Sequence, residues 1–196
     1  GTNTLEGGTG NDTLTGGSGT DTATYANAGS AVTVDLSAGT ASGGDGSDTL
    51  SSIENVTGSG SNDSLKGDAN ANVLDGGSGD DTLEGGGGND TLTGGSGTDT
   101  ITYANAGSAV TVDMSGGATG AGSASGGDGS DSFTGIENVT GSGSNDILTG
   151  DSAANVLTGG GGDDTLAGGA GNDTLVGTSG TNTLEGGTGN DTLTGG

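Results

Sequence analysis

The sequence predicts an all-β fold, a parallel solenoid with flattened turns of about 18 residues and some longer rungs. Three observations lead to this prediction. The chain carries a glycine- and aspartate-rich repeat of nine residues, the pattern of repeats is itself duplicated, and large apolar residues are too few for an ordinary globular core.

The composition limits both the fold and the partners. Of the 196 residues, 51 are Gly and 25% are hydrophobic, and the net charge is -25. Low hydrophobicity with high net charge is typical of disordered chains unless something outside the sequence stabilises them. Lys66 is the only Lys or Arg, which excludes nucleic-acid binding, and no apolar run is long enough for membrane insertion. The partner that such a chain requires is a cation.

The repeat has the form G-G-x-G-x-D-x-U-x, in which U is a large apolar residue. Its fixed period argues against disorder. Clean copies are Gly7–Thr15, Gly76–Glu84, Gly85–Thr93, Gly94–Thr102, Gly159–Ala167, Gly168–Val176 and Gly186–Thr194. Gly16–Thr24 has Ala23 at the U position, Gly43–Ser51 and Gly126–Thr134 are isolated copies, and weaker copies begin at Gly58, Gly67, Gly141, Gly150 and Gly177.

The chain also contains repeats that are longer than the nonapeptide. Residues 11–88 and 89–171 are near-duplicates, and the second copy has five extra residues within 114–125. Residues 180–196 are identical to residues 1–17, a shift of 179 residues. We therefore predict that residues 1–196 form one continuous solenoid segment of a tandem array.

The two halves of the nonapeptide predict a turn and a short strand. The glycine-rich half reaches backbone conformations closed to other residues, and x-U-x alternates polar, apolar and polar. Two units make one flattened turn of about 18 residues, so that the U side chains from both sides meet in a core. The predicted core ladder consists of Leu14, Leu50, Leu65, Leu74, Leu83, Leu92, Ile101, Phe133, Leu148, Leu157, Leu166, Leu175, Leu184 and Leu193.

The aspartates of such a solenoid require a cation. Strands of successive turns lie about 4.8 Å apart, which brings aspartates 18 residues apart close together. At that distance two unit charges repel by roughly 1 kcal/mol in water and about 3 kcal/mol near a protein surface. Carboxylates and backbone carbonyls are hard oxygen ligands, and a flexible glycine-rich site suits calcium better than magnesium. We expect several bound Ca²⁺ ions.

The nonapeptides, for example GGTGNDTLT at residues 7–15, resemble the RTX (repeats-in-toxin) family of calcium-binding repeats. The resemblance implies a right-handed parallel β-roll, in which the position-six Asp and carbonyls of the glycine loop hold calcium between turns. It also implies type I secretion and folding outside the cell. The ligands that it implies are Asp12, Asp21, Asp48, Asp63, Asp81, Asp90, Asp99, Asp131, Asp146, Asp164, Asp173 and Asp191. Asn72, Asn155 and Asn182 depart from the family pattern, because they stand where it has Asp.

Two further features have structural interpretations. Tyr25 and Tyr103 open the long inserts, where we expect them to cap a wider part of the core. Paired carboxylates such as Asp80 and Asp81 lie in repeat loops, with no nucleophile and base beside them. The chain is therefore not expected to be an enzyme.

The sequence favours a structural function. The 179-residue period predicts an extender or filament segment of a large secreted or cell-surface bacterial adhesin or fibre, whose partners are calcium ions and further copies of itself end to end. One alternative is a calcium-responsive module of a secreted toxin or enzyme. The other is an ice-binding face, for which ladders of outward Thr at position seven are the candidates: Thr82, Thr91, Thr100, Thr165, Thr174, Thr183 and Thr192.

Overall fold

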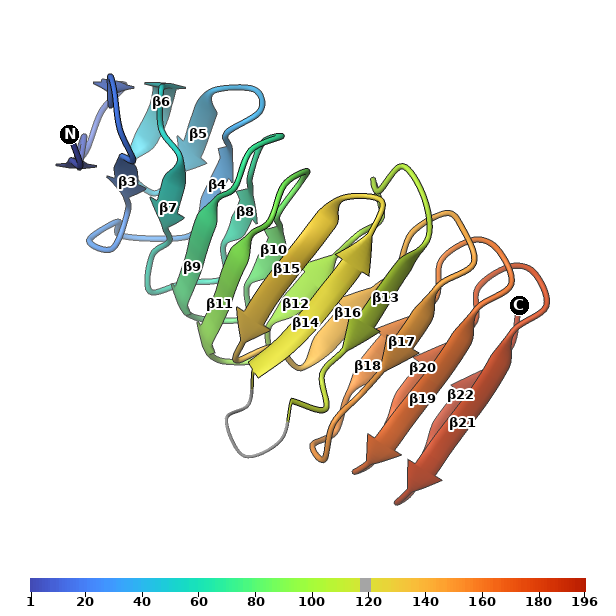
Figure 1. Cartoon of the computed structure of the whole chain (residues 1–196). Coiled ribbons are helices and arrows are strands. Elements are labelled where there is room, and N and C mark those ends of the chain that lie inside the picture. Colours follow the sequence, from blue (N-terminus) through green and yellow to red (C-terminus); the bar gives the residue numbers. More distant parts are fainter. Residues whose placement is uncertain (117–120) are drawn as a thin grey trace. The chain divides into compact units, whose positions relative to one another are not determined.

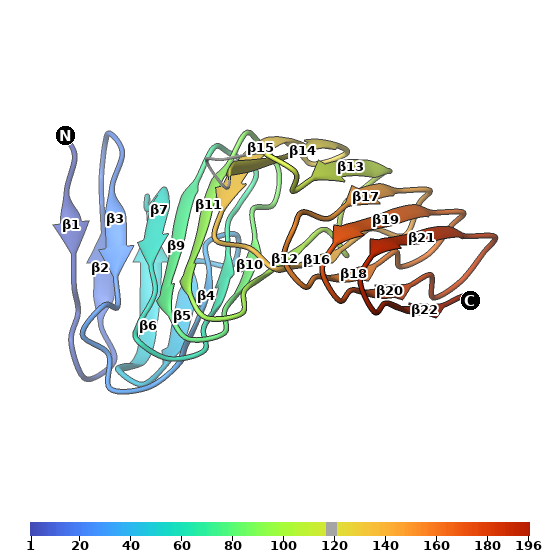
Figure 2. The same ribbon diagram turned by 90° about the horizontal axis from the view of Figure 1, so that it is seen from below.

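The computed structural model describes residues 1–116 and 121–196, and all regular elements in these ranges are β-strands (Figures 1 and 2). The chain divides into two compact units, residues 1–99 and 100–196. Each unit is a β-roll, in which consecutive strands build two facing sheets. The all-β parallel fold predicted from the repeat is confirmed, whereas one continuous segment over residues 1–196 stays a prediction.

The first unit contains eleven short strands. They are β1 (Thr4–Leu5), β2 (Thr13–Thr15), β3 (Thr22–Thr24), β4 (Val32–Asp35), β5 (Thr40–Gly43), β6 (Gly46–Ser51), β7 (Asn55–Thr57), β8 (Ser64–Lys66), β9 (Val73–Ser78), β10 (Thr82–Glu84) and β11 (Thr91–Ser96). One sheet has the order β1-β3-β7-β9-β11, and the other has the order β2-β6-β5-β4-β8-β10.

The described part of the second unit repeats this arrangement. Its strands are β12 (Thr100–Thr102), β13 (Val110–Asp113), β14 (Ala121–Gly126), β15 (Gly129–Thr134), β16 (Asn138–Thr140), β17 (Ile147–Thr149), β18 (Val156–Thr158), β19 (Thr165–Ala170), β20 (Thr174–Val176), β21 (Thr183–Thr188) and β22 (Thr192–Thr194). The sheets have the orders β15-β14-β13-β17-β19-β21 and β12-β16-β18-β20-β22.

The parallel register brings the same nonapeptide position of successive turns together. Leu65 pairs with Leu83 and Leu74 with Leu92 in the first unit, each 18 residues apart. The central residue of each x-U-x strand points inward, and twelve of the fourteen predicted ladder residues are buried. Leu184 and Leu193 are the two exceptions, and Leu193 is 46% exposed. They lie on β21 and β22, the outermost strands of their sheets in the part of the chain that the structure describes.

Each insert adds an antiparallel hairpin to an otherwise parallel sheet. In the first unit β5 pairs antiparallel with both β4 and β6. In the second unit β14 pairs in the same way with β13 and β15. The isolated nonapeptide copy at residues 43–51 supplies the hairpin turn, because Gly43 pairs with Gly46 and only Gly44 and Asp45 lie between. This copy therefore differs from the repeat loop that its sequence resembles.

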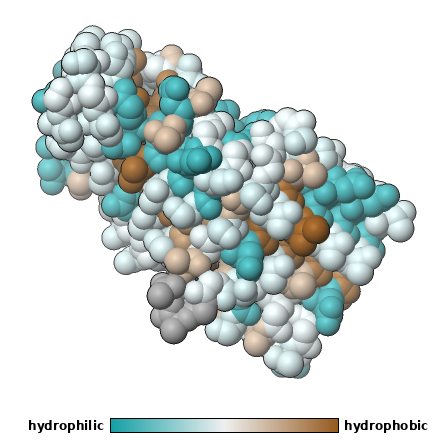
Figure 3. Space-filling view, viewed as in Figure 1, coloured by the Kyte–Doolittle hydropathy of each residue, from teal (hydrophilic) through white to brown (hydrophobic). Residues whose placement is uncertain are grey.

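The surface is mainly polar, as the outward positions of the strands require. Figure 3 shows hydrophobic residues on the visible face only as small separate patches. Among the described residues no helix is long and apolar enough to cross a membrane.

Candidate calcium site

The position-six carboxylates form a hydrogen-bonded column along each edge of the rolls. The amide of Asp63 donates to Asp81 Oδ1 at 2.7 Å, and the amide of Asp81 donates to Asp99 Oδ1 at 2.8 Å. In the second unit the amide of Asp146 donates to Asp164 Oδ1 at 2.9 Å. Each Oδ1 thus receives the amide of the turn before it, and Oδ2 is the atom left to contact a ligand.

The first glycine of each repeat creates the space around Oδ2. A Cβ on Gly76 would lie 2.3 Å from Asp81 Oδ2 and 2.7 Å from the carbonyl oxygen of Gly94 in the next turn. Gly168 has the same surroundings, at 2.4 Å from Asp173 Oδ2 and 2.6 Å from the Gly186 carbonyl oxygen. A carboxylate oxygen and a backbone carbonyl oxygen of the following turn therefore share one cradle, which only glycine leaves open.

This cradle fits a calcium ion. Five carboxylates have a buried Oδ2 that accepts no hydrogen bond, those of Asp12, Asp21, Asp81, Asp164 and Asp173. A buried charged oxygen without a partner is strongly unfavourable, and a cation removes that penalty. Calcium takes six to eight oxygen ligands from carboxylates, backbone carbonyls and water, in flexible geometry. The described residues contain no group of three or more His, Cys, Asp or Glu side chains suited to a metal, so backbone carbonyls must complete each site.

Burial and mutual repulsion disfavour the charged carboxylates when no cation is bound. Burial, followed by the charges of Asp63, Asp99 and Asp80, raises the pKa of Asp81 to about 6. The amide of Asp63 partly opposes this rise. The pKa of Asp164 is also raised, mainly by burial and in part by Asp146 and Asp163.

Comparison with known families agrees with this geometry. The model of the RTX calcium-binding nonapeptide repeat matches residues 1–25, 51–83, 75–105, 140–175 and 176–196, more than half of the chain. The chain belongs to the RTX calcium-binding nonapeptide repeat family. RTX repeats bind several calcium ions per domain, so calcium is the cofactor of this chain. The matched segments leave out residues 26–50 and 106–139, which contain the inserted hairpins. No curated protein matches the chain.

The predicted ligands do not all have the same surroundings in the RTX rolls. Asp48 and Asp131 lie on β6 and β15, strands of the inserted hairpins. The hydroxyls of Tyr25 and Tyr103 donate to their Oδ2 atoms at 3.1 and 2.9 Å. Both tyrosines are buried, so they pack within the core and do not cap it. Burial and the nearby Asp48 raise the pKa of Tyr25.

Asp63 and Asp146 form another pair with internal partners. The Ser59 amide donates to Asp63 Oδ2, and the Ser142 amide donates to Asp146 Oδ2 at 2.5 Å. The hydroxyls of the same serines donate to Oδ1, each at 2.8 Å. Asp191, near the outermost turn, is half-buried.

A second column runs through position five, which the sequence analysis did not single out. The amide of Asp80 donates to Asn62 Oδ1 at 2.9 Å, and the amide of Thr98 donates to Asp80 Oδ1 at 2.8 Å. Here the later turn donates to the earlier one, opposite to the position-six column. The sequence signal for this column was the frequent Asn or Asp at position five, directly before the position-six Asp. The side chains of Asn and Asp readily accept hydrogen bonds from nearby backbone amides.

The raised pKa of Asp81 predicts a pH effect in the absence of calcium. An acid whose pKa is raised to about 6 on folding favours the folded state below its unfolded value near 3.8, and this contribution is lost as the pH rises through 6. Acidification of calcium-free protein from pH 7 to pH 5 is therefore expected to increase its content of β-structure, measured by circular dichroism in buffer stripped of divalent ions. With calcium present the proton competes with the ion, and the trend should reverse. A β-structure content of calcium-free protein that falls on acidification over this range would contradict the prediction.

Proposed function

We propose that this chain is a calcium-stabilised structural segment, an extender or filament piece of a large extracellular bacterial adhesin or surface fibre. The observation that carries the proposal is the exact recurrence of residues 1–17 as residues 180–196, together with the near-duplicate halves. Both halves form the same elements in the same order, including the antiparallel hairpin and the buried Tyr–Asp hydrogen bond. A solenoid of this kind grows by adding turns, without a new core.

In this proposal the calcium ligands are the position-six carboxylates of the repeat loops. They are Asp12, Asp21, Asp81, Asp90, Asp99, Asp164, Asp173 and Asp191. Support comes from the buried Oδ2 atoms and from the glycine cradles that hold a carbonyl oxygen of the next turn beside them. We propose no catalytic role, and secretion by a type I system is part of the proposal.

The ice-binding alternative receives less support from the outward positions of the sheets. Thr82 pairs with Ser64, and Thr91 pairs with Val73. In the second unit Thr165 pairs with Ile147 on one side and with Thr183 on the other. The rows are therefore not unbroken ladders of Thr.

The extender role predicts association of chains through the outermost turns in calcium. The outermost strand β22 pairs with β20 alone within the second unit, and Leu193 on it is 46% exposed. An unpaired edge with exposed apolar surface is a template for another chain. Sedimentation velocity is expected to show association that increases with concentration in calcium and disappears in chelator. Leu193→Lys should abolish association while the number of bound calcium ions stays the same.

Two outcomes would count against the extender. A chain that stays monomeric at the highest concentration in calcium would favour the accessory module of a secreted toxin or enzyme. Association that Leu193→Lys leaves unchanged would place the contact elsewhere on the surface and remove the end-to-end interpretation.

A further inference from the structure

The loops of the RTX rolls fall into two kinds that differ at position two. In the loops of clean repeats this residue is glycine with positive φ, for example 98° at Gly77, 87° at Gly86 and 96° at Gly160. Four weaker copies have Ser59, Asp68, Ser142 and Asp151 there, and none of these has positive φ. The fifth weaker copy has Thr178 there, which keeps a positive φ of 60° and so belongs with the glycine loops. Residues with a Cβ disfavour the left-handed region, so the peptide groups of the two kinds of loop point differently.

The altered backbone turns an amide toward position six in all four copies. The amides of Ser59 and Ser142 donate to Oδ2 of Asp63 and Asp146. The amides of Asp68 and Asp151 donate to Oδ1 of Asn72 and Asn155 at 2.8 and 2.9 Å. An amide N–H aimed at the position-six oxygen supplies positive partial charge that the repeat loop lacks, and it occupies the oxygen that calcium would use.

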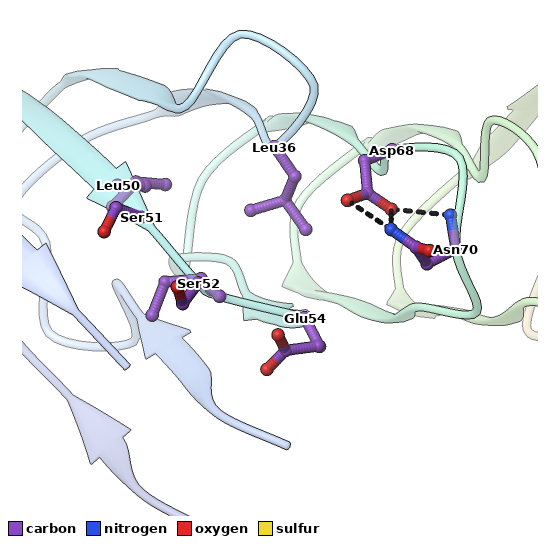
Figure 4. A pocket seen from close by; sticks show the side chains of 8 residues that line it. Leu36, Leu50, Ser51, Ser52, Glu54, Asp68 and Asn70 are labelled. Carbon is purple, nitrogen blue, oxygen red and sulfur yellow. Dashed lines mark hydrogen bonds between the residues drawn. The ribbon is translucent and has the colours of Figure 1, made fainter. Parts of the chain in front are cut away.

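Position four reinforces this arrangement. The Ser61 amide donates to Ser59 Oγ at 3.1 Å, and the Ser144 amide donates to Ser142 Oγ at 3.0 Å. In the next loop the Asn70 amide donates to Asp68 Oδ1 at 2.7 Å, as Figure 4 shows. The side chain at position two thus fixes a local turn that positive-φ glycines do not form.

The asparagines supply a second internal donor. Asn72 Nδ2 donates to the carbonyl oxygen of Glu54 at 2.7 Å, and Asn155 Nδ2 donates to that of Glu137 at 2.9 Å. An amide nitrogen therefore bonds to a backbone oxygen of the adjacent turn. At Asp48 and Asp131 the tyrosine hydroxyl donates to Oδ2 instead. Six position-six residues, three in each near-duplicate, therefore have such internal donors: Asp48, Asp63, Asn72, Asp131, Asp146 and Asn155.

We propose that positions two and four of the nonapeptide exclude calcium from the turns of Asp63, Asn72, Asp146 and Asn155. The turns of Asp48 and Asp131 keep glycine at both positions, and we propose that they hold no calcium because a tyrosine hydroxyl bonds to Oδ2. In these turns an N–H or O–H group of the chain takes the place of the cation. The first glycine does not distinguish these turns from the calcium-binding turns. A Cβ on Gly58 would also lie 2.5 Å from both Asp63 Oδ2 and the Gly76 carbonyl oxygen. The inference rests on calcium binding by the repeats and not on the extender role.

The chain offers a reciprocal test. Ser59→Gly with Ser61→Gly converts the loop GSGSND at residues 58–63 into GGGGND, the sequence of residues 85–90. This double variant should bind one more calcium ion per chain than the original protein, counted by native mass spectrometry and equilibrium dialysis. Ser18→Gly with Ser78→Gly is the matched control, because it changes two serines at position three and should leave the count unchanged. A folded Ser59→Gly/Ser61→Gly variant with an unchanged count would overturn the proposal.

Single carboxylate variants keep the test decisive if the glycine variant does not fold. Asp63→Asn and Asp48→Asn should leave the number of calcium ions unchanged, whereas Asp81→Asn should lower it. Loss of an ion in Asp63→Asn or Asp48→Asn would overturn the proposal. If the original protein bound no calcium, the failure would lie in the calcium function of the repeats and not in the choice of turns.

Discussion

Chelation of calcium at pH 7 is expected to convert most of the β-structure of the repeat turns into disordered chain, and millimolar calcium is expected to restore it. The net charge of -25 and the columns of position-six carboxylates oppose folding when no cation is bound. Neighbouring carboxylates of a column repel by roughly 1 to 3 kcal/mol. The short strands bury little beyond one large apolar residue each, about 1.5–3 kcal/mol for a leucine, while ordering each residue costs about 1–2 kcal/mol of backbone entropy.

Far-UV circular dichroism in chelator, followed by calcium addition, measures this effect. Magnesium at the same concentration is the control, since it requires a stricter octahedral geometry and retains its waters, and it should restore much less structure. Hydrogen exchange would locate the loss, which we expect to be greatest around Asp81, Asp164 and Asp173. An unchanged β spectrum in chelator would contradict a ligand role for these carboxylates.

Periodicity predicted the parts of the fold that depend on local pattern. The nine-residue spacing of Asp and Leu predicted three-residue strands, 18-residue turns and the buried Leu ladder, because inward positions of stacked turns must all be apolar. The inserted hairpins were not predicted. A GGDG sequence can form a repeat loop or a two-residue hairpin turn, and at residues 43–46 the pairing of β5 with β6 selects the hairpin.

The roles of individual position-six residues depended on partners far away in the sequence. Asp48 matches the repeat as well as Asp81 does, but the Tyr25 hydroxyl reaches it from 23 residues away. Periodicity carries no information on such a contact. The case of Asp63 is different, because Ser59 in place of glycine was visible in the sequence. The structure shows why this matters: the position-two glycines of the clean repeats have positive φ, and Ser59 does not.

The second large effect is expected from Gly76→Ala, which should close the calcium cradle of Asp81. Gly76 does not have positive φ, so alanine is compatible with its backbone. The new methyl group would nevertheless lie 2.3 Å from Asp81 Oδ2 and 2.7 Å from the Gly94 carbonyl oxygen, the atoms proposed to face the ion. Overpacking of this kind costs about 1–3 kcal/mol, which corresponds to roughly a fivefold to hundredfold change in an equilibrium constant.

Gly87→Ala is the matched control for this variant. Gly87 also lacks positive φ, and its Cβ would meet nothing closer than the Ala69 Cα at 3.6 Å, an ordinary contact. Calcium titrations followed by circular dichroism should show a midpoint at least several-fold higher for Gly76→Ala, together with loss of a bound ion. Gly87→Ala should keep the midpoint or lower it slightly, because alanine reduces the entropy of the unfolded chain. Equal midpoints in the two variants would mean that the first glycine does not line the calcium site, and the ligand geometry proposed for Asp81 would then have to be abandoned.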